Sequence, residues 1–167
     1  MPELGDWLVS RVILPSEWRA QPWKNGGGVT REVVRWPDVD DYDVRVSVAE
    51  VAQPGPFSRF AGHRRWSVLL EPARIGLSTG EATAWLTDVG DVLELDGDVA
   101  ITSRLPDGPT CLLNIIGRPG TRVGVGASST PVRFVFAVAA HKDLARWHAR
   151  VLDPPRGVAA GPIVWIA

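Results

Sequence analysis

Short segments in which apolar and polar residues alternate are the dominant pattern along the chain. In residues 43–51, DVRVSVAEV, Val44, Val46 and Val48 occupy every second position. Because side chains of a β-strand alternate between its two faces, these valines share one face, and Arg45 and Ser47 lie on the other. Other segments are equally short, rich in Val, Ile, Thr or aromatic residues, and bounded by Gly, Pro, Asp or Ser, as is typical of strands. They cover residues 29–36, 65–71, 73–79, 98–104, 110–117, 121–126 and 131–140.

Prolines and glycines are spread along the whole chain, which disfavours helices of ordinary length. There are 14 prolines and 17 glycines. Only residues 141–157 are ambiguous. Leu144, Trp147 and Val151 are spaced as one helical face, but the segment could equally be a loop that leads into a strand at 149–153. We therefore expect an all-β protein, either a sandwich or a barrel.

The length and charge of the chain limit the classes of protein to which it can belong. A chain of 167 residues suffices for one compact unit. With 18 basic and 19 acidic residues, its net charge of −1 provides no field that would attract nucleic acid or an anionic membrane. The single cysteine, Cys111, suits a reducing compartment. The first residues, MPELGDWLVSRVILP, lack the pattern of a secretory signal, so we expect a cytoplasmic protein without a nucleic-acid or membrane partner.

Arginines interrupt the strand patterns. In residues 29–36, alternation predicts Arg31 and Arg35 on one face and Thr30 and Glu32 on the other. An arginine among valines is costly to bury unless it meets a carboxylate. Glu50 or Glu32 could be this internal partner; alternatively, the guanidinium could hold the carboxylate of a ligand. In a barrel the polar face of residues 43–51 would line the lumen, whereas in an open sheet it would be solvated.

Three consecutive glycines stand in residues 22–32, PWKNGGGVTRE. A folded domain keeps glycines where the backbone turns tightly or approaches another group closely. We expect the glycines to turn the chain sharply into the first barrel strand. This turn would bring Lys24 and Asn25 to the mouth of an anion-binding pocket that Arg31 and Arg45 line from inside.

Motifs for other chemistry are missing from the sequence. His63, His141 and His148 are not at ligand spacing, so we expect no metal site and no cofactor. The glycine run lacks the Lys-Ser/Thr ending of a phosphate loop, and no Gly-x-Ser-x-Gly elbow is present. If the chain were an enzyme, the candidate general bases would be Glu50 and His63.

Three motifs in this order, PWKNGGGVTREV, VRVSVAEVAQPGPFSRFAGHRRWSVLLE and LNIIGR, resemble the HutD/Ves family. The similarity is strongest over residues 14–70 and weaker over 98–120. It implies a cupin-like (RmlC-like) double-stranded β-helix barrel without a metal requirement. The implied organisation is one compact unit over residues 1–167: a bicupin with its main barrel at 14–120 and a reduced second barrel completed by strands of 121–167.

The resemblance also implies a function. The family is associated with histidine-utilisation operons, which suggests a metal-free protein that binds a small carboxylate such as N-formylglutamate and regulates histidine or amino-acid utilisation. The alternative is a cofactor-independent cupin enzyme, an isomerase or epimerase acting on a small carboxylate; of the two we favour binding. The eight tryptophans could form a homodimer interface or belong to a core.

Positions that match the pocket motifs of the family are the implied ligand-binding residues. One departure is that the late Asp-Phe-Asn motif of the family reads Leu112-Leu113-Asn114 here, so the ligand could differ from that of the relatives. The implied residues are Trp23, Lys24, Asn25, Thr30, Arg31, Arg45, Ser47, Glu50, Phe57, Ser58, Phe60, Gly62, Arg65, Asn114 and Arg118.

Overall fold

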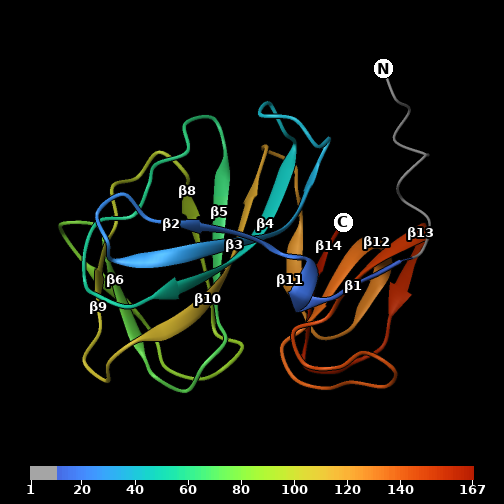
Figure 1. Cartoon of the computed structure of the whole chain (residues 1–167). Coiled ribbons are helices and arrows are strands. Elements are labelled where there is room, and N and C mark those ends of the chain that lie inside the picture. Colours follow the sequence, from blue (N-terminus) through green and yellow to red (C-terminus); the bar gives the residue numbers. More distant parts are fainter. Residues whose placement is uncertain (1–10) are drawn as a thin grey trace. The chain divides into compact units, whose positions relative to one another are not determined.

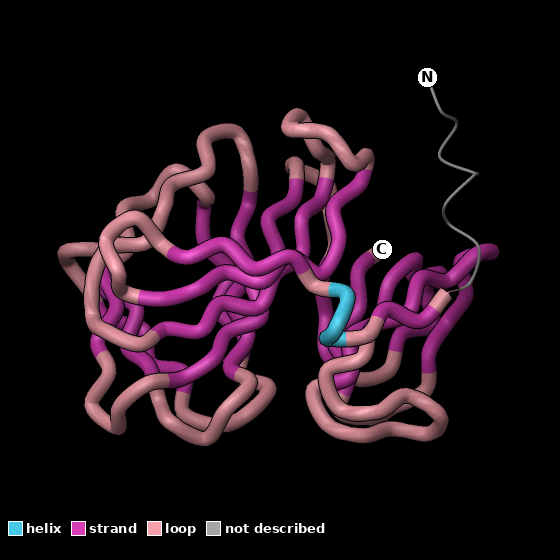
Figure 2. The backbone as a smooth tube through the Cα atoms, in the orientation of Figure 1, coloured by secondary structure: helices cyan, strands magenta, loops and turns pink. Residues whose placement is uncertain are grey.

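The computed structural model describes residues 11–167, which divide into two compact units. One unit consists of residues 19–119, and the other of residues 11–18 and 120–167 (Figure 1). Strands form almost all the regular structure; the one helical element of the described chain is a 3-10 turn, η1 (Pro15–Glu17) (Figure 2). The prediction of an all-β protein is therefore confirmed.

That residues 1–167 act as a single bicupin stays a prediction. The expectation that no secretory signal is present rests largely on residues 1–10, which lie outside the described part.

The unit of residues 19–119 contains two antiparallel sheets. The larger sheet has the strand order β2-β3-β4-β10-β5-β8, and the smaller has the order β7-β6-β9. The strands of the larger sheet are β2 (Arg19–Pro22), β3 (Gly28–Trp36), β4 (Val44–Val51), β5 (Arg64–Leu69), β8 (Val92–Asp96) and β10 (Thr110–Gly117). Those of the smaller sheet are β6 (Ile75–Ser78), β7 (Thr83–Leu86) and β9 (Thr102–Arg104).

An apolar core joins these two sheets. Leu69 of β5 and Leu112 of β10 pack in one cluster with Ile75 and Leu77 of β6 and Leu86 of β7, and all five are at most 3% exposed. Burial of such side chains is the main favourable contribution to folding. The two sheets thus pack against each other across this cluster.

The register of the larger sheet places a gradient of polarity next to this core. Residues that face each other across neighbouring strands form rows on the same side of the sheet. Moving away from the core, an apolar row is followed by a polar row and then by a row with two arginines. These rows are Ala49–Leu112–Leu69, Ser47–Asn114–Ser67 and Arg45–Ile116–Arg65.

A β-bulge in β3 changes which side chains share a face. Glu32 faces Ser47 of β4, but Val34 faces Val46, so Val33 is an extra residue in β3. Strict alternation predicts Arg35 on the face opposite Glu32. The extra residue reverses the alternation, and Arg35 instead lies opposite Arg45 on the same face as Glu32. The prediction for Arg35 was therefore wrong, because a bulge leaves no mark in the apolar pattern.

The second unit is built on a five-stranded antiparallel sheet of order β1-β13-β12-β14-β11. Its core includes Val132, Leu144, Leu152 and Ile163. Residues 141–157 form no helix: a turn leads into a strand, as one of the two alternatives predicted. The strands are β1 (Val12–Ile13), β11 (Val123–Val125), β12 (Ser128–Ala137), β13 (Ala149–Val158) and β14 (Ile163–Ile166).

All eight strands expected from the pattern are present, but several others were not predicted. The missed strands are short. β1 and β14 are wholly apolar, VI and IVWI, and the others have mixed composition: β2 reads RAQP, β7 reads TAWL and β8 reads VLELD. Two to five residues are too few for alternation to stand out from chance. These strands form because neighbouring strands offer backbone hydrogen-bond partners, a condition that only the assembled sheet supplies.

Candidate functional site

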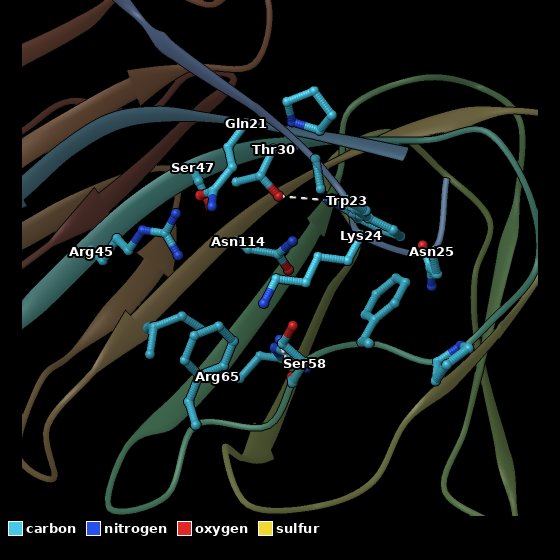
Figure 3. Close-up of a pocket in the computed structure, with 16 residues that line it drawn as sticks. Gln21, Trp23, Lys24, Asn25, Thr30, Arg45, Ser47, Ser58, Arg65 and Asn114 are labelled. Atoms are coloured by element: carbon cyan, nitrogen blue, oxygen red, sulfur yellow. Dashed lines mark hydrogen bonds between the residues drawn. The ribbon is translucent and has the colours of Figure 1, made fainter. Parts of the chain in front are cut away.

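A pocket of about 520 Å³ opens beside the polar rows of the unit of residues 19–119. It is bounded by the β2–β3 hairpin, by β4 and β10, and by the loop of residues 52–63 (Figure 3). A volume of this size is typical of small-molecule sites. The lining residues are Gln21, Pro22, Trp23, Lys24, Asn25, Thr30, Arg45, Ser47, Ala49, Pro56, Phe57, Ser58, Phe60, Arg65, Asn114 and Ile116.

The glycine run forms the tight turn of the β2–β3 hairpin. Gly26 has a φ of 72°, a conformation that favours glycine. The Gly27 N–H donates to Asn25 Oδ1 at 2.9 Å, and a Cβ atom on Gly28 would overlap the backbone carbonyl of Glu50. The turn therefore needs glycine both for its conformation and for close approach. It places Lys24 and Asn25 at the pocket, as the sequence predicted.

Aromatic side chains support one wall of the pocket. Trp23 Nε1 donates to Thr30 Oγ1 at 2.8 Å, and the dashed line in Figure 3 marks this bond. The Trp23 ring meets the edge of the Phe57 ring at a centroid distance of 5.6 Å. The hairpin and the loop of residues 52–63 thus hold each other at the pocket wall.

Arg65 is the most unusual group in the pocket. Arg65 is only 4% exposed, and it forms no ion pair with a carboxylate of residues 11–167. Nη2 donates to the Ser58 carbonyl at 2.9 Å, but Nε and Nη1 are buried without a hydrogen-bond partner. The Phe57 and Phe60 rings lie 5.7 and 5.1 Å from Cζ. Burial lowers the pKa of Arg65 to about 10, so the side chain remains charged at neutral pH.

Two further cations point into the pocket. Lys24 extends into it from the hairpin, and no ion pair forms between Lys24 and a carboxylate of the described chain (Figure 3). Arg45 reaches in from β4 and binds Glu32 through Nε at 2.8 Å. The pocket therefore has three positive side chains, and Glu32, which offsets part of their charge, does not line it.

Polar side chains between these cations retain hydrogen-bonding capacity. Asn114 is 8% exposed, and its Oδ1 accepts a hydrogen bond from Ser67 Oγ at 2.7 Å. The amide nitrogen of Asn114 forms no hydrogen bond with residues 11–167. The Ser47 hydroxyl, 4% exposed, likewise has none within that range. Both groups can donate to an acceptor in the pocket.

Four residues expected in the pocket do not line it: Arg31, Glu50, Gly62 and Arg118. Arg31 and Glu50 pair with each other on the opposite face of the sheet, with Nε–Oε1 and Nη2–Oε2 distances of 3.2 and 3.3 Å. The physical reason is alternation, because Thr30 and Ala49 face the pocket and their chain neighbours must face away. The internal partner considered for Arg31 is thus its actual partner.

Arg118 is also outside the pocket. It follows β10 and pairs with Asp43 at 3.0 Å and with Asp41, and these carboxylates raise its pKa. Arg118 therefore links the end of β10 to the loop before β4, where its partners lie, and does not reach the pocket.

Neither candidate general base lines the pocket. Glu50 is on the far face of the sheet, and His63 contacts the Ala61 and Tyr42 carbonyls at 3.1 and 3.5 Å. No group of three or more His, Cys, Asp or Glu side chains that could hold a metal ion is found within residues 11–167. None of the helical structure in this range is long and apolar enough to cross a bilayer.

The structure also adds pocket residues that the sequence did not indicate. Gln21 and Pro22 belong to β2, which was not predicted, and Ala49 and Ile116 continue the face of Ser47 and Asn114. Alternation along β4 and β10 was a usable signal for Ala49 and Ile116. Pro56 pairs with Thr102 across the unit, so only the tertiary fold places it here.

Sequence comparisons identify relatives of the chain. The HutD family model matches residues 15–144. A protein of Pseudomonas putida described as an uncharacterized 21.2 kDa protein in the hutC 3′ region is 29% identical over 112 residues, which is 65% of this chain and 58% of that protein. Protein Ves of Escherichia fergusonii is 31% identical over 58% of this chain and 51% of its own length. The matched region thus spans little more than half of these curated relatives.

Solved structures share the fold. The structure of HutD from Pseudomonas fluorescens, described as a formate condition, matches with a TM-score of 0.83 and 26% identity, covering 95% of this chain and 97% of that one. A conserved protein of unknown function from Pseudomonas aeruginosa gives a TM-score of 0.77 at 24% identity, covering 95% and 96%. KdgF of Halomonas sp. gives 0.51 at 11% identity, covering 65% and 93%. The predicted cupin-like fold class is confirmed.

Proposed function

The chain belongs to the HutD family, and from this premise we propose that it binds a small carboxylate and regulates histidine or amino-acid utilisation. The binding site is the pocket of residues 19–119. Arg65 is the main anchor for the carboxylate, and Lys24, Arg45, Ser47 and Asn114 complete the site.

One observation supports this proposal above all others: the unpaired Arg65. A buried charge is normally paired, because its transfer from water costs several kcal/mol without compensation. Arg65 has two buried N–H groups without an acceptor and lines an open pocket. A negatively charged ligand in the pocket would offset this buried charge; Nε and Nη1 point in different directions, so they would meet separate acceptor atoms.

The rest of the pocket suits the same ligand. Lys24 and Arg45 add positive charge, and the free donors of Ser47 and Asn114 can bind a further oxygen. The P. putida relative is described by its place in the hutC 3′ region, which suits a role in histidine utilisation, and formate is a simple carboxylate probe because the P. fluorescens HutD structure is described as a formate condition. N-formylglutamate carries both a formyl group and carboxylates, and so is a suitable first ligand.

Calorimetric and thermal-shift titrations with formate, glutamate and N-formylglutamate test this function. We expect the wild-type protein to be stabilised by at least one of these ligands. Replacement of one anchoring cation, in Lys24→Ala or Arg45→Ala, should weaken binding about tenfold, which corresponds to the loss of one charge-assisted hydrogen bond. Arg65→Met should abolish binding.

Arg64→Met is the matched control, because Arg64 stands next to Arg65 in β5 but pairs with Glu94 at 3.0 Å and does not line the pocket. Its affinity should equal that of the wild type. Unchanged affinity in Lys24→Ala, Arg45→Ala and Arg65→Met would remove these residues from the site. NMR spectra of the ligand recorded over hours complete the test, because a new product resonance would indicate an enzyme.

A further inference from the structure

The carboxylate of Glu32 is shared by three arginines just behind the pocket. Oε1 accepts a hydrogen bond from Arg19 Nη2 at 2.7 Å and lies 3.5 Å from Arg35 Nε. Oε2 accepts from Arg45 Nε at 2.8 Å. The Glu32 side chain is 10% exposed, so solvent screens these interactions little. Arg19 and Arg35 hold one oxygen of the carboxylate, and the other oxygen is directed at Arg45.

The β3 bulge creates this arrangement. Without the extra Val33, the alternation of β3 would place Arg35 on the face away from Glu32. With the bulge, Arg35 and Glu32 lie on the same face and meet Arg45 of the neighbouring strand. Bulges commonly redirect side chains next to functional sites.

Glu32 holds Arg45 through the inner edge of its guanidinium, and the Tyr42 side chain also lies within hydrogen-bonding reach of Arg45. Its bond to Glu32 uses Nε, whereas its two terminal nitrogens carry four of the five N–H donors. Figure 3 shows these terminal nitrogens turned into the pocket, on the side of Ser47 and Asn114. The Arg45 side chain is 17% exposed, so few rotamers are open to it.

We propose that Glu32 is a positioning residue of the carboxylate site, which fixes Arg45 through Nε so that the terminal nitrogens face the pocket as a fork. This inference rests on the proposed function of the pocket. Glu32 itself does not line the pocket; it lines a neighbouring cavity that shares Gln21 and Arg45 with it. Arg19 and Arg35 keep Glu32 in place when Arg45 binds a ligand.

The property that follows is selectivity for a planar carboxylate over a spherical anion. A fixed fork matches the two oxygens of a carboxylate, but gives no such advantage to chloride. Removal of Glu32 has two effects: it releases the fork, and it removes a negative charge that repels every anion. Formate binding should therefore weaken, and chloride binding should stay the same or strengthen.

Thermal-shift titrations with sodium formate and sodium chloride measure this selectivity. We expect Glu32→Ala to lower the ratio of formate affinity to chloride affinity about five- to tenfold, the size expected for one charge-assisted hydrogen bond. Glu32→Gln keeps the shape and an acceptor oxygen but holds the guanidinium less strongly, and should lower the ratio about threefold. If Glu32→Ala does not fold, Glu32→Gln decides the test.

A double-mutant cycle shows whether Glu32 acts through Arg45. Arg45→Lys keeps the positive charge without the fork and should lower the ratio as Glu32→Ala does. The double variant should show no further loss, because both changes remove the same feature. Glu94→Ala is the control: it removes a comparable ion pair, that with Arg64, away from the pocket, and should leave the ratio unchanged.

Other outcomes would overturn the inference. An equal fall in formate and chloride affinity would make Glu32 merely structural, and an equal rise would make it a competing internal anion. If the double variant lowers the ratio of formate affinity to chloride affinity by the product of the two single effects, Glu32 does not act through Arg45. If the wild-type protein binds formate and the ratio is unchanged in the Glu32 variants, this inference alone fails. If the wild-type protein binds no carboxylate, the proposed function fails with it.

Discussion

The buried charge of Arg65 destabilises the folded protein but can bind an anion. Its pKa is lowered to about 10 by burial, so the protonated side chain destabilises the ligand-free fold at every pH below that value. A lowering of this size from the ordinary value of an arginine corresponds to a cost of roughly 3 kcal/mol. The Ser58 carbonyl and the rings of Phe57 and Phe60 offset part of it. Function and stability thus oppose each other at this residue, as they often do in binding sites.

We predict that Arg65→Met stabilises the ligand-free protein. Methionine fills a similar volume without a buried charge, and the free energy of unfolding should rise by about 1 kcal/mol. Urea denaturation of the wild type and the variant, without ligand, measures this difference. The same variant should gain no stability from formate. A ligand-free Arg65→Met protein that is 2 kcal/mol or more less stable than the wild type would contradict this account.

At the scale of elements, two local features of the first hairpin, the glycine turn and the β3 bulge, determine the geometry of the site. The glycine turn brings the β2 end of the hairpin over the pocket, and the β3 bulge brings Glu32 and Arg35 onto the face of Arg45. The glycine turn could be predicted because glycine runs have few other uses in a folded domain. The bulge could not, since a bulged strand keeps an ordinary composition and its register is set by the partner strand.

We predict that Gly28→Ala disrupts the hairpin. The added Cβ would overlap the Glu50 carbonyl and lie 3.2 Å from the Trp23 ring, so the backbone would have to shift. Thermal unfolding should show a loss of roughly 1–3 kcal/mol, and carboxylate affinity should fall because Lys24 moves. Gly55→Ala is the matched control, because its Cβ would meet no atom closer than 4.0 Å. Equal stability of the two variants would show that the turn tolerates a side chain.

At the scale of the whole molecule, all residues of the pocket belong to one of the two units. Each lining residue lies within residues 19–119, and the unit of residues 11–18 and 120–167 has a separate core that includes Val132 and Leu152. Ligand binding should therefore change local stability unevenly along the chain.

Amide hydrogen exchange measured with and without formate tests this distribution. We expect slower exchange in β3, β4, β10 and the loop of residues 52–63, because a bound anion links these segments. Exchange over residues 120–167 should change little. Protection confined to residues 120–167 would place the ligand outside the described pocket.

The sequence by itself determined the class of fold and most of the pocket. Period-two alternation fixed the strands and the shared face of Arg45 and Ser47, because a strand has only two faces. The motif resemblance supplied Lys24, Arg65 and Asn114, all of which line the pocket. The tertiary structure alone decided which arginines are free. Arg31 meets Glu50, whereas Arg65 meets no carboxylate of the described residues, because ion pairing depends on strand register and on a bulge that local composition does not encode.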